Sequence, residues 1–195
     1  MPLVLTFLLL AVAAAWQPAA AVVGAGNGGA GQAGMEFVRG CCAHTLYPRL
    51  CRAGLAPYAA AVHSSYARLA LASANLTLTT LDALAARIPP PGSGGALGDC
   101  AEAVAAAADE AARAAERLRG VEQAVGLEVI WRVGDARTWL SAAMTNEDTC
   151  AEGISPRKSA PAPVRAELRA RVRRAKQYTS IALALVSMLV SNPRS

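Results

Sequence analysis

Apolar and small residues recur at steps of three and four through four long segments of the chain. Such steps place side chains on one face of an α-helix, because 3.6 residues complete a turn. The segments cover about residues 63–87, 99–119, 122–144 and 163–189. Their predicted inward faces are Tyr66, Leu69, Ser73, Leu76, Thr80 and Leu84; Val104, Ala107, Ala111, Ala114 and Leu118; Val129, Val133, Ala136, Trp139, Leu140 and Ala143; and Val164, Leu168, Val172, Ala175, Thr179, Ala182, Val186 and Leu189. Four amphipathic helices joined by short breaks predict an up-and-down four-helix bundle.

Proline, glycine and capping residues mark the ends of these helices. The stretch "PPPGSGG" ends the first helix, and "SPRKSAPAP" separates the third from the fourth. Asp99, with Glu102 three residues later, predicts a capped start for the second helix. Ahead of the bundle, Pro48 interrupts "EFVRGCCAHTLYPRLC", which predicts two short helical pieces folded on one another.

The N-terminal region has the pattern of an export signal followed by a linker. The apolar run "LVLTFLLLAVAAAW" and the small residues of "QPAAAVV" predict a signal peptide over residues 1–21, cleaved near Ala21. A transmembrane anchor is less favoured, because the run is shorter than the roughly 20 residues that a bilayer requires. Glycine-rich residues 22–34 predict a flexible linker, so the mature domain is expected over residues 35–195, outside the cell and without a membrane attachment.

Composition agrees with an all-α fold. Hydrophobic residues make up 54% of the chain, but much of this fraction is alanine, and aromatic residues are only 5%. Alanine has the highest helix propensity, whereas strands favour β-branched and aromatic residues. This composition therefore suits a β-sandwich poorly.

Five cysteines follow the predicted leader, and an exported chain is expected to form two disulfides from them and leave one thiol. Cys100 in the second helix and Cys150 just past the third lie at the same end of an antiparallel pair, so we expect them to be bonded. Cys42 and Cys51 would close a much smaller loop, which leaves Cys41 free. Neither His44 nor His63 has zinc-site spacing to a cysteine pair, so no metal and no cofactor is expected.

One glycosylation sequon is present at Asn75-Leu76-Thr77. Asn75 shares a helix face with Arg68, Thr79 and Asp82, so its side chain is expected to reach solvent. An exported chain would carry a glycan there.

Three motifs carry a resemblance to a known family. "CAHTLYPRLC", "LGDCAEA" and "DARTWLSAAMTNEDTCAEG" follow one another as in the plant invertase and pectin methylesterase inhibitor family, which the chain resembles over about residues 35–190. The first and third motifs are specific to the family. The resemblance implies an N-terminal helical hairpin on a four-helix bundle, with the framework cysteines paired first to second and third to fourth.

The resemblance also implies a function. "TWLSAAMTNEDTC" is similar to the pectin methylesterase inhibitors, and the Pro-Lys-Phe motif of invertase inhibitors is missing. A secreted inhibitor is implied that forms a stoichiometric complex with pectin methylesterase, blocks its pectin-binding cleft and regulates pectin de-esterification in the cell wall. Inhibition of cell-wall or vacuolar acid invertase is the alternative.

By the same resemblance, Thr149, Glu152 and Asp109 are the expected partner contacts. Each has an ordinary structural interpretation as well. The Thr149 hydroxyl can form a local turn hydrogen bond, and the two carboxylates can be solvated surface charges.

Basic residues gather between Arg157 and Lys176, where eight of them accompany one acidic residue, Glu167. The ordinary interpretation is a solvated outer face. The alternative is attraction of a chain with net charge +5 to de-esterified pectin, which is a polyanion. Export argues against nucleic acid as the partner.

The sequence offers no catalytic constellation. Catalysis would need a base beside a nucleophile, or paired carboxylates, and neither histidine has such a partner at motif spacing. We therefore expect an enzyme inhibitor and not an enzyme.

Overall fold

The computed structural model describes residues 27–154 and 162–191, and every regular element in these ranges is helical. The N-terminal part holds α1 (Asn27–Cys42), α2 (Pro48–Leu55), the 3-10 helix η1 (Ala56–Tyr58) and α3 (Ala59–Val62). The four long helices are α4 (Tyr66–Ala85), α5 (Gly95–Leu118), α6 (Leu127–Gly153) and α7 (Ala162–Ser191). The all-α prediction is confirmed.

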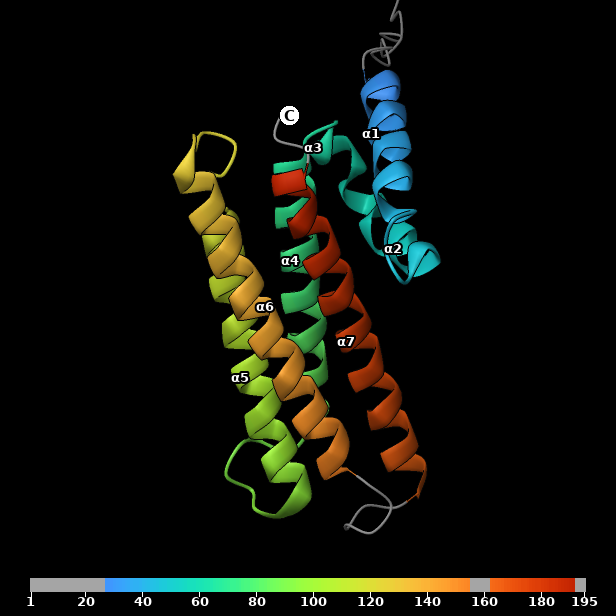
Figure 1. Cartoon of the computed structure of the whole chain (residues 1–195). Helices are drawn as coiled ribbons and strands as arrows, with labels where there is room; N and C mark the ends of the chain where they lie inside the picture. The colour runs from blue at the N-terminus through green and yellow to red at the C-terminus, as the bar shows by residue number, and fades with distance from the viewer. Residues whose placement is uncertain (1–26, 155–161, 192–195) are drawn as a thin grey trace, which may run out of the picture.

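The long helices form the predicted bundle. Each packs against two others: α4 and α6 each contact both α5 and α7 (Figure 1). The segment α1–α3 lies beside α4 and α7, with α1 and α2 forming a hairpin. Pro48 is the first residue of α2, where its missing N–H costs no helical hydrogen bond.

Alanine dominates the bundle core. The fully buried side chains include Ala107, Ala111 and Ala114 of α5, while leucines such as Leu81 and Leu140 fill the larger spaces. The separation of packed helices depends on the side chains at their contact, so small residues allow close approach. The low aromatic content of the chain follows from this packing. Within the described ranges, no helix is long and apolar enough to cross a membrane.

The glycine-rich segment does not behave as predicted over residues 27–34. These residues belong to α1, so the expectation of a flexible linker is wrong for them, whereas residues 1–26 with the predicted signal peptide lie outside the described residues. Gly34 is buried against α3, and a Cβ there would lie 2.0 Å from the Ala59 carbonyl oxygen. The missing side chain lets α1 pack closely, and that packing extends the helix.

The start of α5 differs from the prediction. The helix begins at Gly95, directly after Gly94 with φ 73°, so Asp99 lies inside α5 and caps nothing. Ala96 and Gly98 are buried, and their packing extends the helix toward its N-terminus. The predicted capping box is therefore wrong.

The bounds of α6 also differ. The helix begins at Leu127 after Gly126, not near residue 122, and it continues to Gly153, well beyond Met144. Cys150 consequently lies within α6 and not past its end.

Several predicted core residues lie nearer to the surface than expected. Trp139 is only half-buried, and the Arg113 guanidinium carbon lies 4.8 Å from its ring centroid. Val164 is 49% exposed. On α4 the buried face is rotated slightly, because Thr77 and Leu81 are fully buried while the predicted Leu76 and Thr80 are half-buried.

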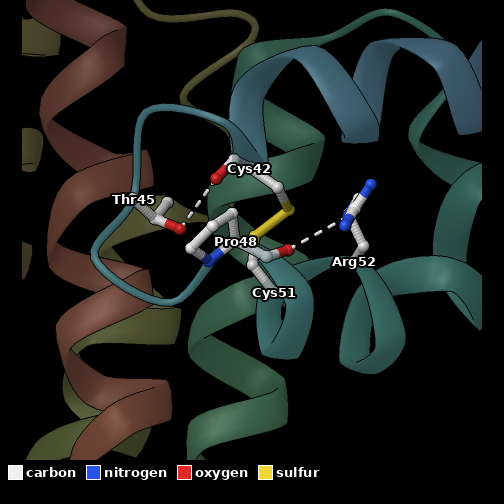
Figure 2. The surroundings of a disulfide bond; sticks show 5 residues. All are labelled: Cys42, Thr45, Pro48, Cys51 and Arg52. Atoms are coloured by element: carbon white, nitrogen blue, oxygen red, sulfur yellow. Dashed lines mark hydrogen bonds between the residues drawn. A yellow bond between two sulfur atoms is a disulfide. The ribbon is translucent and has the colours of Figure 1, made fainter.

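Both predicted disulfide pairs are present. Cys42 at the end of α1 is bonded to Cys51 in α2, with Cα atoms 5.6 Å apart (Figure 2). In the turn between them, the Thr45 hydroxyl donates to the Cys42 carbonyl oxygen at 2.9 Å. Cys100 is bonded to Cys150, with Cα atoms 4.1 Å apart, and this bond joins the start of α5 to the end of α6. Cys41 is free and buried, and burial raises the pKa of its thiol to about 11.

Candidate partner-binding surface

The outer face of α6 presents a row of hydroxyl groups. Thr138, Ser141, Thr145 and Thr149 follow one another at steps of three and four, and all are exposed. The Thr149 hydroxyl donates to the Thr145 carbonyl oxygen at 3.0 Å, and Thr145 donates in the same way to Ser141 at 3.1 Å. These bonds use the hydroxyl hydrogens within the helix and leave oxygen lone pairs facing solvent.

Between Thr145 and Thr149, three consecutive residues of α6 attach this helix to its two neighbours, α5 and α7. The Asn146 side-chain amide donates to Glu110 of α5 at 2.9 Å. Glu147 accepts a hydrogen bond from the Thr179 hydroxyl of α7 at 2.7 Å, and Asp148 pairs with Lys176 of α7 at 2.5 Å. Together with the Cys150 disulfide to α5, these contacts fix the position of Thr149.

Glu147 is a feature that the sequence reasoning missed. Its side chain is 0% exposed, and its Oε2 atom has no hydrogen-bond partner among the described residues. Burial is the largest influence and raises the pKa of the carboxyl to about 8, although the hydrogen bond from Thr179 acts in the opposite direction. The carboxyl is therefore neutral over the acidic and neutral pH range. The available signal was its spacing, since Ala143, Glu147 and Cys150 continue the inward face at steps of four and three.

The predicted contacts lie in two places. Glu152 is exposed in the last turn of α6, three residues after Thr149 and therefore on the same side of the helix. Asp109 is exposed on α5, nine residues beyond Cys100 and thus about 13 Å further along that helix. The structure brings Thr149 and Glu152 together at the disulfide-bonded end of the α5–α6 pair and places Asp109 nearer the middle.

The sequon is less open than predicted. Asn75 is half-buried in α4, while its neighbours on the predicted face, Arg68, Thr79 and Asp82, are exposed. Thr77 of the sequon is fully buried. Glycosylation at Asn75 stays a prediction.

No three histidine, cysteine, aspartate or glutamate side chains in residues 27–154 and 162–191 gather closely enough to hold a metal ion. Arg157 and Lys158 of the basic segment lie outside the described residues.

The fold and this surface define a class of protein: a disulfide-stapled helical bundle in which bonds to both neighbouring helices hold α6 in place. The sequence model of a family described as "Plant invertase/pectin methylesterase inhibitor" matches residues 36–185. The chain belongs to this family, which places it among enzyme inhibitors and not enzymes.

Individual proteins that are similar to this chain support the same family assignment. The chain is 30% identical over 168 residues to pectinesterase inhibitor 10 of Arabidopsis thaliana, covering 82% of this chain and 53% of that protein, so it spans about half of that relative's length. Pectinesterase inhibitor 11 of the same species is 30% identical over 162 residues, with coverages of 78% and 80%. The "21 kDa protein" of Daucus carota is 28% identical over 165 residues, with coverages of 78% and 82%. The predicted closeness to the pectin methylesterase inhibitors is confirmed.

The chain is also similar to a solved structure, the crystal structure of mutant form A of a pectin methylesterase inhibitor from Arabidopsis. It covers 75% of this chain and 93% of its own, at 20% identity and a TM-score of 0.39. At this TM-score and identity, the similarity carries no argument about the fold.

Proposed function

We propose that this chain is a secreted inhibitor of pectin methylesterase that regulates the de-esterification of pectin in the cell wall. The observation that carries the proposal is the family match over residues 36–185, together with relatives that are named pectinesterase inhibitors. The inhibitor would form a one-to-one complex and cover the cleft through which pectin reaches the catalytic residues.

The end of α6 is the proposed contact surface, with Thr149 and Glu152 facing the esterase. Inhibition by blocking a cleft favours a surface that is rigid before binding, because ordering side chains and loops on association costs affinity. The disulfide to α5 and the contacts of Asn146, Glu147 and Asp148 supply this rigidity. Asp109, on the neighbouring helix, is proposed to contact the esterase nearer the middle of the bundle.

Acid invertase is the second candidate target, because the family description names both enzymes. A direct comparison decides between them. The secreted, oxidised protein is titrated against a plant pectin methylesterase and against a cell-wall acid invertase under the same conditions. We expect esterase activity to fall linearly to an end point at one inhibitor per enzyme, with invertase unaffected. Inhibition of invertase alone would reverse the assignment, and turnover of pectin or sucrose by the protein itself would end it.

The site of action is proposed to be the apoplast. Export would remove residues 1–21 and leave a protein without a membrane attachment. The net charge of +5 would attract the protein weakly to de-esterified pectin. N-terminal sequencing of the protein recovered from wall fluid would test the cleavage.

A further inference from the structure

Three exposed arginines of α6 and α7 lie along one line and have no acidic partner among the described residues. Other arginines of the bundle are paired, as Arg68 is with Glu122 and Arg171 is with Glu167. Arg137 of α6 and Arg169 and Arg173 of α7 are exposed, and no hydrogen bond or ion pair holds any of them among the described residues.

Helix α6 packs against α7 (Figure 1), and the spacing of these arginines along the two helices puts them on the seam between α6 and α7. The ion pair between Asp148 and Lys176 crosses this seam. On α7, Arg173 and Arg169 precede Lys176 by three and seven residues, which keeps them on the side of the helix that faces α6. On α6, Arg137 precedes Asp148 by eleven residues, or three turns, and so lies on the side that faces α7. The line of cations is therefore roughly 27 Å long, at 1.5 Å per residue.

The seam is hollowed around Arg137. An open groove there is lined by Gly134, Arg137, Thr138, Ser141, Leu183, Ala184 and Ser187. The Thr138 hydroxyl donates to the Gly134 carbonyl oxygen at 3.0 Å, and Ser187 donates to Leu183 at 2.8 Å. Both hydroxyl oxygens thus keep free lone pairs that can accept hydrogen bonds from a ligand.

This combination fits an acidic sugar polymer. Guanidinium groups bind carboxylates through two parallel hydrogen bonds, and the hydroxyl oxygens are suited to accept from sugar hydroxyls. Single-stranded nucleic acid usually needs aromatic side chains on which bases can stack, and none lines this groove. We infer that the α6–α7 seam binds a linear polyuronate chain, with Arg137, Arg169 and Arg173 contacting its carboxylates.

The identity of the polymer as de-esterified pectin rests on the proposed function. Esterase action on pectin exposes the carboxylates that these arginines would recognise. Binding along the seam would hold the inhibitor on the stretches of polymer where the esterase has already acted, and fully esterified stretches would release it.

The test measures binding of the full oxidised protein to polygalacturonate, in the absence of any esterase, by affinity electrophoresis and calorimetry at low salt. The seam variant Arg169→Gln/Arg173→Gln is compared with Arg39→Gln/Arg49→Gln, which removes the same charge from exposed arginines of α1 and α2. We expect the seam variant to bind at least fivefold more weakly and the control to bind within twofold of the unmodified protein. Arg137→Gln alone should also weaken binding, with unchanged thermal melts throughout.

Several results would overturn the inference. Equal losses in the seam and control variants would show that only net charge matters. Equal binding of highly esterified pectin, or of single-stranded DNA of the same charge, would show that uronate carboxylates are not recognised. Esterase titration of the same variants separates the two proposals, because polymer binding without inhibition removes the link to pectin turnover, and inhibition without polymer binding removes the seam site.

Discussion

At the scale of single residues, the buried carboxyl of Glu147 makes the stability of the fold depend on pH. Its pKa is about 8 in the folded chain, raised from 4.5, so between these values the folded protein holds a proton that the unfolded chain has lost. The stabilisation is complete below pH 4.5 and is lost as the pH rises through 8. The free energy of unfolding should fall by up to about 1.4 kcal/mol per pH unit within this window.

Replacing Glu147 with glutamine tests this prediction, because the amide keeps the size of the group but does not titrate. We expect Glu147→Gln to flatten the fall in stability measured by denaturant unfolding between pH 5 and pH 8. The control is Glu152→Gln, which removes an exposed carboxyl from the same helix. The Asp148–Lys176 ion pair is present in both variants. An unchanged pH profile in Glu147→Gln would contradict the assignment.

Thr149 offers a second prediction at this scale, and Thr79 provides its control. Both are exposed, and both donate to the carbonyl oxygen four residues earlier, at 3.0 Å and 2.9 Å. We expect Thr149→Lys to weaken esterase inhibition at least tenfold, or about 1.4 kcal/mol, because it places a long charged side chain in the contact surface. Thr79→Lys on α4 should retain full potency, with both melts near that of the unmodified protein. Equal potency of the two variants would move the contact surface elsewhere.

The spacing of Glu147 could be read from the sequence, but its burial could not. The residue continues an inward face, yet it lies within the polar run Thr145–Thr149. The helix predicted from the sequence ends at Met144, just before that run. Only the observed continuation of α6 to Gly153 places Glu147 in the core.

At the scale of elements, two neighbouring apolar residues of α6 differ in burial and should therefore differ in their contribution to stability. Leu140 is fully buried, whereas its neighbour Trp139 is half-buried beside Arg113. Leu140→Ala should cost about 2–5 kcal/mol, because it leaves a cavity in the core. Trp139→Ala should cost less, since part of the ring already contacts solvent. Unfolding by urea measures both, and a larger loss for Trp139→Ala would show that its contact with the core outweighs its exposure.

The periodicity of the sequence predicted the helices and most of their inward faces, because burial of apolar residues determines both. It did not predict their ends. Asp99 has the chemistry of a cap, but packing of Ala96 and Gly98 extends α5 past it. The helical run over residues 27–34 could not be predicted from composition either, since it depends on the contact of Gly34 with Ala59.

At the scale of the whole molecule, the two disulfides should contribute unequally to stability. The bond Cys42–Cys51 closes a separation of 9 residues and the bond Cys100–Cys150 one of 50. In the chain-entropy model these loops are worth about 2.6 and 4.1 kcal/mol. We therefore expect Cys100→Ala/Cys150→Ala to lower the free energy of unfolding more than Cys42→Ala/Cys51→Ala does. The reverse order in urea unfolding would indicate that packing around the hairpin bond dominates.

The bundle architecture was predictable from pattern alone, but the target enzyme was not. Helix faces and breaks determine the fold, whereas recognition depends on exposed residues such as Thr149 and Glu152, which the fold leaves unconstrained. The seam arginines illustrate the same limit. The sequence shows that arginines are abundant, but the alignment of Arg169 and Arg173 of α7 with Arg137 of α6 depends on how the two helices pack.

The position of the second disulfide has a consequence for proteolysis. The connection between α5 and α6 is a surface loop in which Val125 is 80% exposed, and it lies at the opposite end of this helix pair from Cys100 and Cys150 (Figure 1). A protease that cuts this loop breaks the chain but releases neither half, because the disulfide still joins the helices at their far end. The proposed contact surface lies beside that bond. In a compartment that contains proteases, a nicked molecule would therefore remain one covalent unit, and only reduction would separate its parts.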